Sequence, residues 1–197
     1  MTRKLAVCVT GASGSIYARR LLGLLSGRED VEVHLVASAN APMVWKAELE
    51  EPMPRSFPGV HRWDRHDFRA PFASGSNPFD AVLVVPCSMS TLARVANGGG
   101  DDLTTRACEV ALKERRKLVL MVRETPLSLV HLRNMTAATE AGALILPAIP
   151  SFYAGVRSLE QAVDSVLGRI LDHAGVPAEL LPRWGAGDTP APVEEGS

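Results

Sequence analysis

Two loops rich in small and hydroxyl-bearing residues could hold a phosphate or a ring-shaped ligand. They are Thr10-Gly-Ala-Ser-Gly-Ser15 and Pro86-Cys-Ser-Met-Ser-Thr91, and each comes directly after a buried, strand-like run. Where a helix begins after such a turn, backbone N–H groups point toward a bound anion. The alternative is a tight turn whose serine caps the next helix, Ser13 or Ser15 in the first loop and Ser88 in the second. Both loops are therefore candidates for a site that binds a phosphate or a ring.

Charged residues near buried strands form a second group of candidate functional residues. Arg106 and Lys113 are seven residues apart in a predicted helix, so both project from one face. A solvated helix surface is the ordinary interpretation of such a pair. Arg123 and Glu124 follow directly on a predicted buried strand, where charges need partners. The second pair therefore carries the stronger indication of a functional site.

Neither a cysteine nucleophile nor a metal site is expected. Cys87 has no His, Lys or Arg beside it that would lower its pKa, so we expect a small buried hydrophobe there. His61 and His66 lack the spacing of metal ligands. The pair Asp101-Asp102 is not a DDxxD motif, and it predicts the N-cap of a helix. The three cysteines form no CxxC pair, which argues against a disulfide framework.

Strand-like and helix-like runs alternate along the chain, and this alternation predicts a sheet of parallel strands. Strands are expected at 4–10, 31–38, 80–86, 117–123 and 143–147. Helices are expected from 15 and 88, around 43–48, and at 103–116, 128–141 and 158–174. The irregular stretch 51–79 is expected to add one short edge strand. The predicted fold class is α/β, a single-domain doubly wound parallel sheet of Rossmann-like or flavodoxin-like type with helices on both faces.

Composition excludes several classes of protein. The 197 residues include 21 basic and 22 acidic side chains, a net charge of −1, which argues against binding nucleic acid or an anionic membrane by bulk charge. The longest apolar runs are far shorter than the roughly 18–20 residues that span a bilayer. The first ten residues alternate like a strand and have no signal-peptide layout. We therefore expect a cytoplasmic protein.

Six motifs in order resemble the UbiX-type flavin prenyltransferase family, within the FMN-binding Cys-decarboxylase-like flavoproteins. The resemblance extends from Leu5 to about Trp184. It rests on Thr10–Gly14, Pro86–Thr91, Ala111–Arg116, Val122–Leu127 with His131–Met135, Pro150–Tyr153 and Leu181–Trp184. It implies an FMN-binding flavoprotein domain at 1–184, and the Gly-, Pro- and acid-rich residues 185–197 are expected to form a flexible tail. One departure is Ser38-Ala39-Asn40, where several relatives carry Lys after the serine.

The resemblance implies an enzyme that joins reduced FMN, as co-substrate, to dimethylallyl phosphate. Positions that match flavin contacts are Gly11, Ala12, Ser13, Ser38, Ser88, Met89, Ser90, Thr91 and Arg123. Positions that match the surroundings of the prenyl phosphate are Arg106, Lys113, Arg123, Glu124, Tyr153 and Arg169. Catalytic roles are expected for Ser13, Glu48, Lys113 and Glu124, with Glu48 near the flavin. The implied products are phosphate and prenylated FMN, the latter supplied to a partner UbiD-type decarboxylase.

The chemistry fits this resemblance, because ionisation of an allyl phosphate leaves negative charge on the phosphate. Arg106, Lys113, Arg123 and Arg169 with Glu124 would sum to +3 if they converged, as four cations and one carboxylate. Such a cluster could replace the magnesium that diphosphate-dependent prenyltransferases use, so no metal is expected. The resemblance also implies a homo-oligomer, a dodecamer built from trimers, whose pockets lie at subunit borders.

Two other functions remain open at this point. One is an FMN-dependent decarboxylase of the same superfamily, acting on a Cys-containing or phenolic substrate. Sister decarboxylases typically show a histidine in the first helix and a PASANT-like loop, whereas this chain has Ser15-Ile-Tyr17 and Pro86–Thr91, which disfavours that reading. The other is a non-catalytic FMN-binding accessory subunit of a decarboxylase. Only the prenyltransferase needs the phosphate-binding cations.

Overall fold

A six-stranded parallel sheet forms the centre of the protein. A computed structural model describes residues 2–185. The strands lie in the order β3-β2-β1-β4-β5-β6, and every neighbouring pair is parallel. Their bounds are β1 Arg3–Val9, β2 Val31–Ala37, β3 Val60–Trp63, β4 Ala81–Cys87, β5 Lys117–Val122 and β6 Leu144–Ile145. The predicted doubly wound α/β fold is confirmed.

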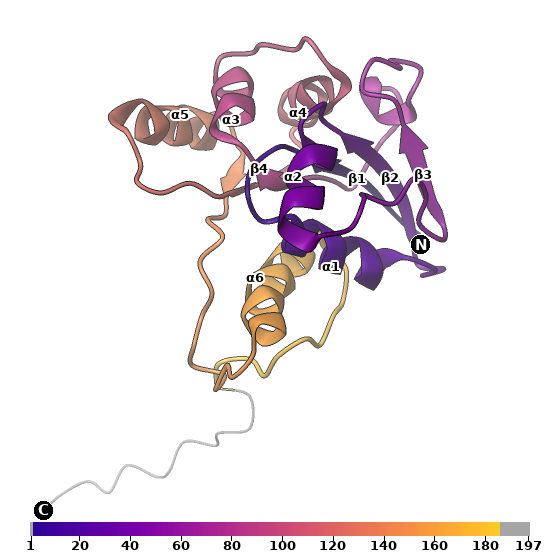
Figure 1. Ribbon diagram of the computed structural model, residues 1–197. Helices are drawn as coiled ribbons and strands as arrows, with labels where there is room; N and C mark the ends of the chain where they lie inside the picture. The colour runs from indigo at the N-terminus through magenta and orange to yellow at the C-terminus, as the bar shows by residue number, and fades with distance from the viewer. Residues whose placement is uncertain (1, 186–197) are drawn as a thin grey trace, which may run out of the picture.

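Helices cover both faces of this sheet (Figure 1). They are α1 Ser15–Leu25, α2 Ala41–Leu49, α3 Met89–Ala96, α4 Leu103–Lys113, α5 Leu129–Glu140 and α6 Leu159–Ala174, with a short 3₁₀ turn η1 at Pro71–Ala73. Alternate residues of β1 point to opposite faces. Leu5, Val7 and Val9 pack in one core with α1, α2 and α6. Ala6 and Cys8 pack in the other with α3 and α4.

Local sequence signals explain most element boundaries. Asp102 caps α4 and forms a capping box with Thr105, as the acidic pair predicted. Ser88 caps α3 by accepting the backbone N–H of Thr91, also as predicted. The prediction that Ser13 or Ser15 caps α1 is wrong. Gly14 occupies the N-cap position, and the N-cap residue makes no side-chain hydrogen bond to the first turn. The predicted edge strand of 51–79 is β3, which pairs with β2.

Two predicted elements are shorter in the structure. The helix expected at 103–116 ends at Lys113, since Arg115 takes a left-handed backbone conformation with φ 53° that turns the chain into β5. The strand expected at 143–147 is regular over only two residues, although the backbone N–H groups of Leu146 and Ala148 still donate to the carbonyls of Leu120 and Val122 of β5 at 2.9 Å. The predicted tail lies, from residue 186 onward, outside the described residues.

Two segments of the chain keep large apolar side chains exposed. Figure 1 shows α5 projecting from the body, and an extended segment that connects β6 to α6. In α5 only Ala138 is buried, while Leu129 and Val130 are each 61% exposed. Ile149 and Phe152 of the connecting segment are exposed as well. Exposed apolar side chains gathered on a projecting helix and on an extended segment are typical of protein–protein interfaces.

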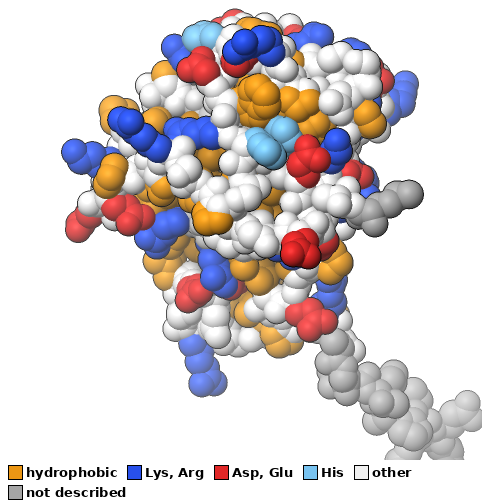
Figure 2. All heavy atoms as spheres, turned by 90° about the vertical axis from the view of Figure 1, so that its right-hand side faces the viewer, with side chains coloured by type: hydrophobic (Ala, Val, Ile, Leu, Met, Phe, Trp, Pro, Cys, Tyr) orange, Lys and Arg blue, Asp and Glu red, His pale blue; other side chains and the backbone are white. Residues whose placement is uncertain are grey.

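The face that contains β3 has a mixed charge distribution. Figure 2 shows basic and acidic side chains interspersed there with apolar ones. This pattern agrees with a net charge of −1. Among residues 2–185, no helix combines the length and the apolar character needed to cross a membrane.

Candidate active site

Thr10 joins the first two candidate loops. Its hydroxyl donates a hydrogen bond to the carbonyl of Pro86 at 2.7 Å and accepts the backbone N–H of Ser88 at 2.9 Å. The side chain is 2% exposed. β1 and β4 are neighbours in the sheet, and β2 lies on the other side of β1, so these loops meet where the strand order reverses. Ligands of open parallel sheets bind in the crevice at this switch point.

The loop after β2 contacts the first loop at Gly11. A Cβ atom at Gly11 would lie 2.6 Å from the Cβ of Asn40, which is too close for two non-bonded carbon atoms. The backbone N–H of Ser38 donates to the carbonyl of Val9 at 2.9 Å, which holds this loop beside β1. Glycine is therefore required at position 11 for close approach of the two loops. Ser38 consequently lies beside the loop that starts at Gly11.

Arg123 closes the site from the β5 side. Its Nε donates to the carbonyl oxygen of Ser13 at 3.0 Å, across 110 positions of sequence. Neither terminal guanidinium nitrogen of Arg123 has an acceptor among the described residues. A half-buried guanidinium with free donors beside backbone N–H groups is suited to a phosphate or to the polar edge of a flavin.

Glu48 of α2 caps the N-terminus of α1. Its carboxylate accepts the backbone N–H of Gly14 at 3.0 and 3.1 Å and that of Ser15 at 2.7 Å. Burial alone would raise the pKa of Glu48, but hydrogen bonds from Ser13, Gly14 and Ser15 outweigh it and lower the pKa. An ionised carboxylate thus already occupies the positive end of α1. In the first loop, the backbone N–H groups of Ala12 and Ser13 are still available to bind a ligand.

The N-terminus of α3 supplies further donors. The Ser88 and Thr91 hydroxyls lie 3.0 Å apart. Met89 and Ser90 are in the first turn, where backbone N–H groups have no acceptor inside the helix. Together with Arg123 and the Gly11 loop, these groups fit a molecule with a polar ring edge and a phosphate, as FMN has. All nine predicted flavin-contact residues belong to the loops that meet here or to Arg123 beside them.

Cys87 has the properties of a core residue. Its side chain is fully buried, and burial raises the pKa of the thiol to about 12. This agrees with the expected role as a small hydrophobe. The other two cysteines are likewise free and buried. Within residues 2–185, no group of three or more His, Cys, Asp or Glu side chains is arranged to hold a metal ion.

The residues predicted to surround the prenyl phosphate do not converge within one chain. Arg106 donates to the carbonyl of Ala73 at 3.0 Å, and Lys113 pairs with Glu114 beside Gly75. They share a helix face, as predicted, but that face contacts the segment around η1. Lys113 ends α4 just before β5 begins, whereas Arg123 comes after β5 ends. Six strand residues span about 20 Å, so Lys113 lies at the amino end of β5 and Arg123 lies at its carboxyl end.

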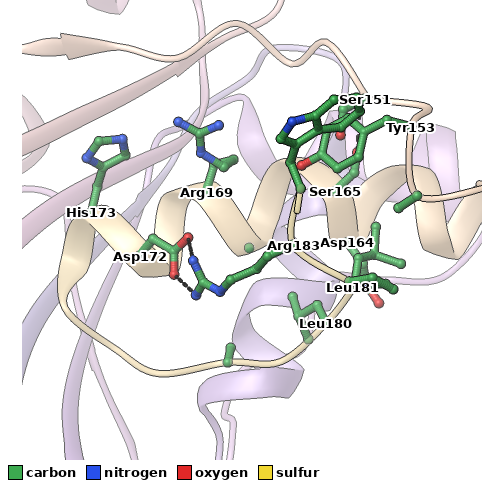
Figure 3. A pocket seen from close by; sticks show the side chains of 15 residues that line it. Ser151, Tyr153, Asp164, Ser165, Arg169, Asp172, His173, Leu180, Leu181 and Arg183 are labelled. Carbon is green, nitrogen blue, oxygen red and sulfur yellow. Dashed lines mark hydrogen bonds and ion pairs between the residues drawn. The ribbon is translucent and has the colours of Figure 1, made fainter. Parts of the chain in front are cut away.

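Tyr153 and Arg169 lie apart both from Arg123 and from the helix face that carries Arg106 and Lys113. They line a pocket of about 460 Å³ between α6 and the segments 151–154 and 178–184 (Figure 3). Glu124 follows Arg123 directly in the sequence, but its carboxylate accepts the backbone N–H of Thr125 at 3.0 Å instead of pairing with Arg123. The single +3 cluster that the sequence suggested is therefore not formed in one subunit. The reason is topological, since α4 and α6 pack on opposite faces of the sheet.

Comparison with known proteins identifies the family of this chain. The profile of a family described as Flavoprotein matches residues 1–171. A relative from Methanocaldococcus jannaschii named flavin prenyltransferase UbiX is 45% identical over 183 residues, which cover 92% of this chain and 98% of the relative. The chain belongs to the UbiX flavin prenyltransferase family.

Two solved structures of UbiX-like proteins have the same fold along nearly their whole length. One is AnUbiX (PadA1) in complex with FMN and dimethylallyl pyrophosphate, with a TM-score of 0.85 and 41% identity, covering 94% of this chain and 98% of that one. The other is a dodecameric FMN-dependent UbiX-like decarboxylase from Escherichia coli O157:H7, with a TM-score of 0.84 and 39% identity, covering 92% and 98%.

Sequence reasoning missed two structural parts of this UbiX-family site. Thr10 was part of a candidate loop, but its role as the link between two loops was not predicted. A threonine that directly follows an apolar, strand-like run is the signal that could have indicated it. Asn40, which packs against Gly11, was also missed, and no local pattern indicated it. Both residues act through contacts between segments distant in sequence.

Proposed function

We propose that this UbiX-family enzyme joins reduced FMN to dimethylallyl phosphate and releases prenylated FMN and phosphate. The observation that carries the proposal is the hydrogen bond from Arg123 to the Ser13 carbonyl. It places a guanidinium with free donors directly beside the loops that fit FMN. A UbiX relative with 41% identity binds both FMN and dimethylallyl pyrophosphate, which supports the same pair of ligands here.

Reduced FMN supplies the nucleophile when bound. The chain's own task is to hold the flavin at the Gly11, Ser38 and Ser88 loops, through the N–H groups of Ala12, Ser13, Met89 and Ser90 and the hydroxyls of Ser38, Ser88 and Thr91. Orienting two reactants in one cavity lowers the barrier by removing much of their freedom to move. Ser13 is expected to contact both the flavin and the prenyl phosphate.

Breaking the allylic C–O bond transfers an electron pair to the phosphate. Arg123 can donate hydrogen bonds to that developing charge, and we infer that Arg106, Lys113, Tyr153 and Arg169 reach it from neighbouring copies. This accounts for their separate places in one chain. It also accounts for the exposed apolar residues of α5 and 149–153. The dodecameric relative supports a homo-oligomer, which we propose to be a dodecamer built from trimers.

Proton transfer completes the proposed reaction. Glu124 adjoins Arg123 in sequence and is assigned the transfer of a proton to the phosphate in the second half of the reaction, with orientation of the arginines as a secondary effect. Glu48 is expected to lie near the flavin. It also orients the loop 10–15, because its carboxylate accepts the backbone N–H groups of Gly14 and Ser15. Lys113 is assigned to charge stabilisation of the phosphate. The positive groups thus take the role that magnesium has in diphosphate-dependent prenyltransferases.

The product is proposed to supply a UbiD-type decarboxylase, because prenylated FMN is made as a cofactor for another enzyme. Three free, buried thiols agree with a reducing compartment, and we propose a cytoplasmic location. The UbiX-like relative from E. coli that is described as a decarboxylase favours a second candidate, FMN-dependent decarboxylation by this chain itself.

Anaerobic incubation tests these functions. Reduced FMN is mixed with the protein and with dimethylallyl phosphate or the pyrophosphate, and the mass of the extracted flavin is measured. The prenyltransferase adds one prenyl group to the flavin. An accessory subunit retains FMN of unchanged mass. A decarboxylase leaves the flavin unchanged and releases CO₂ from an added phenolic acid or Cys-containing peptide, a result that would replace the proposed function.

A further inference from the structure

Three segments build the pocket that contains Arg169 (Figure 3). The backbone N–H of Ser151 donates to the Ser165 hydroxyl of α6 at 3.2 Å. The ring of Tyr153 meets the ring of Trp184 edge-on, with centroids 5.4 Å apart. The C-terminal segment 178–184 therefore forms a wall of this pocket and contacts Tyr153 directly.

Both carboxylates that line this pocket are already paired. Asp164 binds Arg20 of α1 through two hydrogen bonds of 2.9 Å. Asp172 binds Arg183 through two hydrogen bonds of 2.7 and 3.1 Å. Among residues 2–185, no carboxylate oxygen lies within 4.0 Å of the Arg169 guanidinium nitrogens. Arg169 is thus the cation of the pocket that keeps its charge available.

The sequence of α6 alone would predict a partner for the Arg169 guanidinium. Arg169 and Asp172 are three residues apart on α6, a spacing at which opposite charges pair on a helix surface. Arg183 arrives from outside the helix and takes both oxygens of Asp172 in a two-point contact. Figure 3 shows the Arg169 guanidinium pointing away from that pair.

We propose that Arg183 is a positioning residue: by occupying Asp172, it keeps Arg169 free to bind the phosphate of dimethylallyl phosphate. This inference rests on the proposed function, which assigns Arg169 to that phosphate. Without Arg183, the Asp172 carboxylate would compete with the phosphate for Arg169 and would repel the dianion. Arg183 thus acts on the substrate without touching it.

Charge-neutral variants test this inference with turnover of dimethylallyl phosphate. Arg183→Gln keeps most of the side-chain volume and is expected to raise KM for dimethylallyl phosphate about tenfold, the size of effect that one uncompensated charge near a dianion produces. The kcat value is expected to change little. Asp172→Asn alone should leave KM unchanged, because Arg169 stays free. The double variant Arg183→Gln/Asp172→Asn should recover the wild-type KM, because the competing carboxylate is gone.

A merely structural ion pair gives a different pattern, since loss of both partners cannot restore what loss of one removed. An unchanged KM in Arg183→Gln, or no recovery in the double variant, would overturn the inference. Failure of the proposed function has its own signature, a wild-type protein that adds no mass to the flavin. Calorimetric titration of the assembled protein with dimethylallyl phosphate gives the same four-way comparison without turnover, and it decides the inference in that case too.

Discussion

The carboxylate of Glu48 accepts the backbone N–H of Ser15 at 2.7 Å and closes the N-terminus of α1 from another helix. In many nucleotide-binding folds this helix end is left for a phosphate. Here a residue 33 positions away takes that place, and the flavin loop is fixed before any ligand binds. Stability and cofactor binding are therefore linked through one side chain.

Glu48→Ala is expected to lower the free energy of unfolding by about 1–2 kcal/mol, the usual cost of removing a helix cap. Urea denaturation of the purified protein measures this. The pKa of Glu48 is lowered in the folded state, so its contribution is present above the unfolded pKa and is lost as pH falls through the folded pKa. Glu51→Ala removes a half-exposed partner of Arg19 and serves as the control, with a change below about 0.5 kcal/mol. Equal losses in both variants would contradict the capping role.

The double variant Thr91→Val/Ser38→Ala is expected to weaken FMN binding by roughly 1–3 kcal/mol, because polar groups of the flavin lose their partners. Fluorescence titration with FMN gives the affinity. Ser56→Ala removes an exposed hydroxyl from the 51–79 segment and should leave the affinity unchanged. Wild-type affinity in the double variant would remove these loops from the flavin site.

Glu124→Gln is expected to retain FMN and substrate binding while turnover falls roughly 10²–10⁴-fold, the range for a positioned acid or base. The amide keeps the size of the side chain but has no acidic proton that it could transfer. Lys113→Ala should instead weaken binding of dimethylallyl phosphate as well as turnover, because it removes positive charge. Steady-state kinetics separate the two effects. Wild-type turnover in Glu124→Gln would reduce this residue to a structural role.

Val130→Asp is expected to break the oligomer and abolish turnover, because it introduces a charge into the exposed apolar surface of α5. Light scattering at assay concentration reports the mass of the assembly. The matched control is Ser56→Asp, which adds the same charge at an exposed position outside α5. A fully active monomer would refute the shared site.

Lowering the pH from 7.5 toward 5.5 is expected to destabilise the protein through His34. The ring is buried, its Nδ1 accepts the Trp63 indole N–H at 2.8 Å, and its Nε2 lies 2.8 Å from Glu32. Burial lowers the pKa of His34 despite the nearby carboxylate. The unfolded chain therefore takes up the proton first, and stability falls as pH drops below the unfolded pKa of about 6.5. His34→Gln should flatten this part of the stability curve, whereas His66→Gln, at an exposed position, should not. Equal slopes in all three proteins would contradict this assignment.

The order of elements and the flavin loops were predictable because their signals are local. The continuous apolar run of β1 and the helical spacing in α1 and α6 depend on neighbours within a few residues. The Asp102 and Ser88 caps are local as well. The α1 cap was mispredicted, because Glu48 competes for the same N–H groups from a separate helix and forms stronger, charged hydrogen bonds.

The sequence by itself determined an α/β sheet, the loops at the ends of its strands, and the residue types that suit FMN and a phosphate. Only the tertiary structure decided which of these residues meet. Arg123 reaches Ser13 because β5 and β1 end at the same edge of one parallel sheet. Lys113 cannot join them in one chain, because the rise of about 3.3 Å per strand residue places it at the opposite edge. Spacing along a sequence fixes side-chain direction within one element, but distances between elements are set by the packing of the whole sheet.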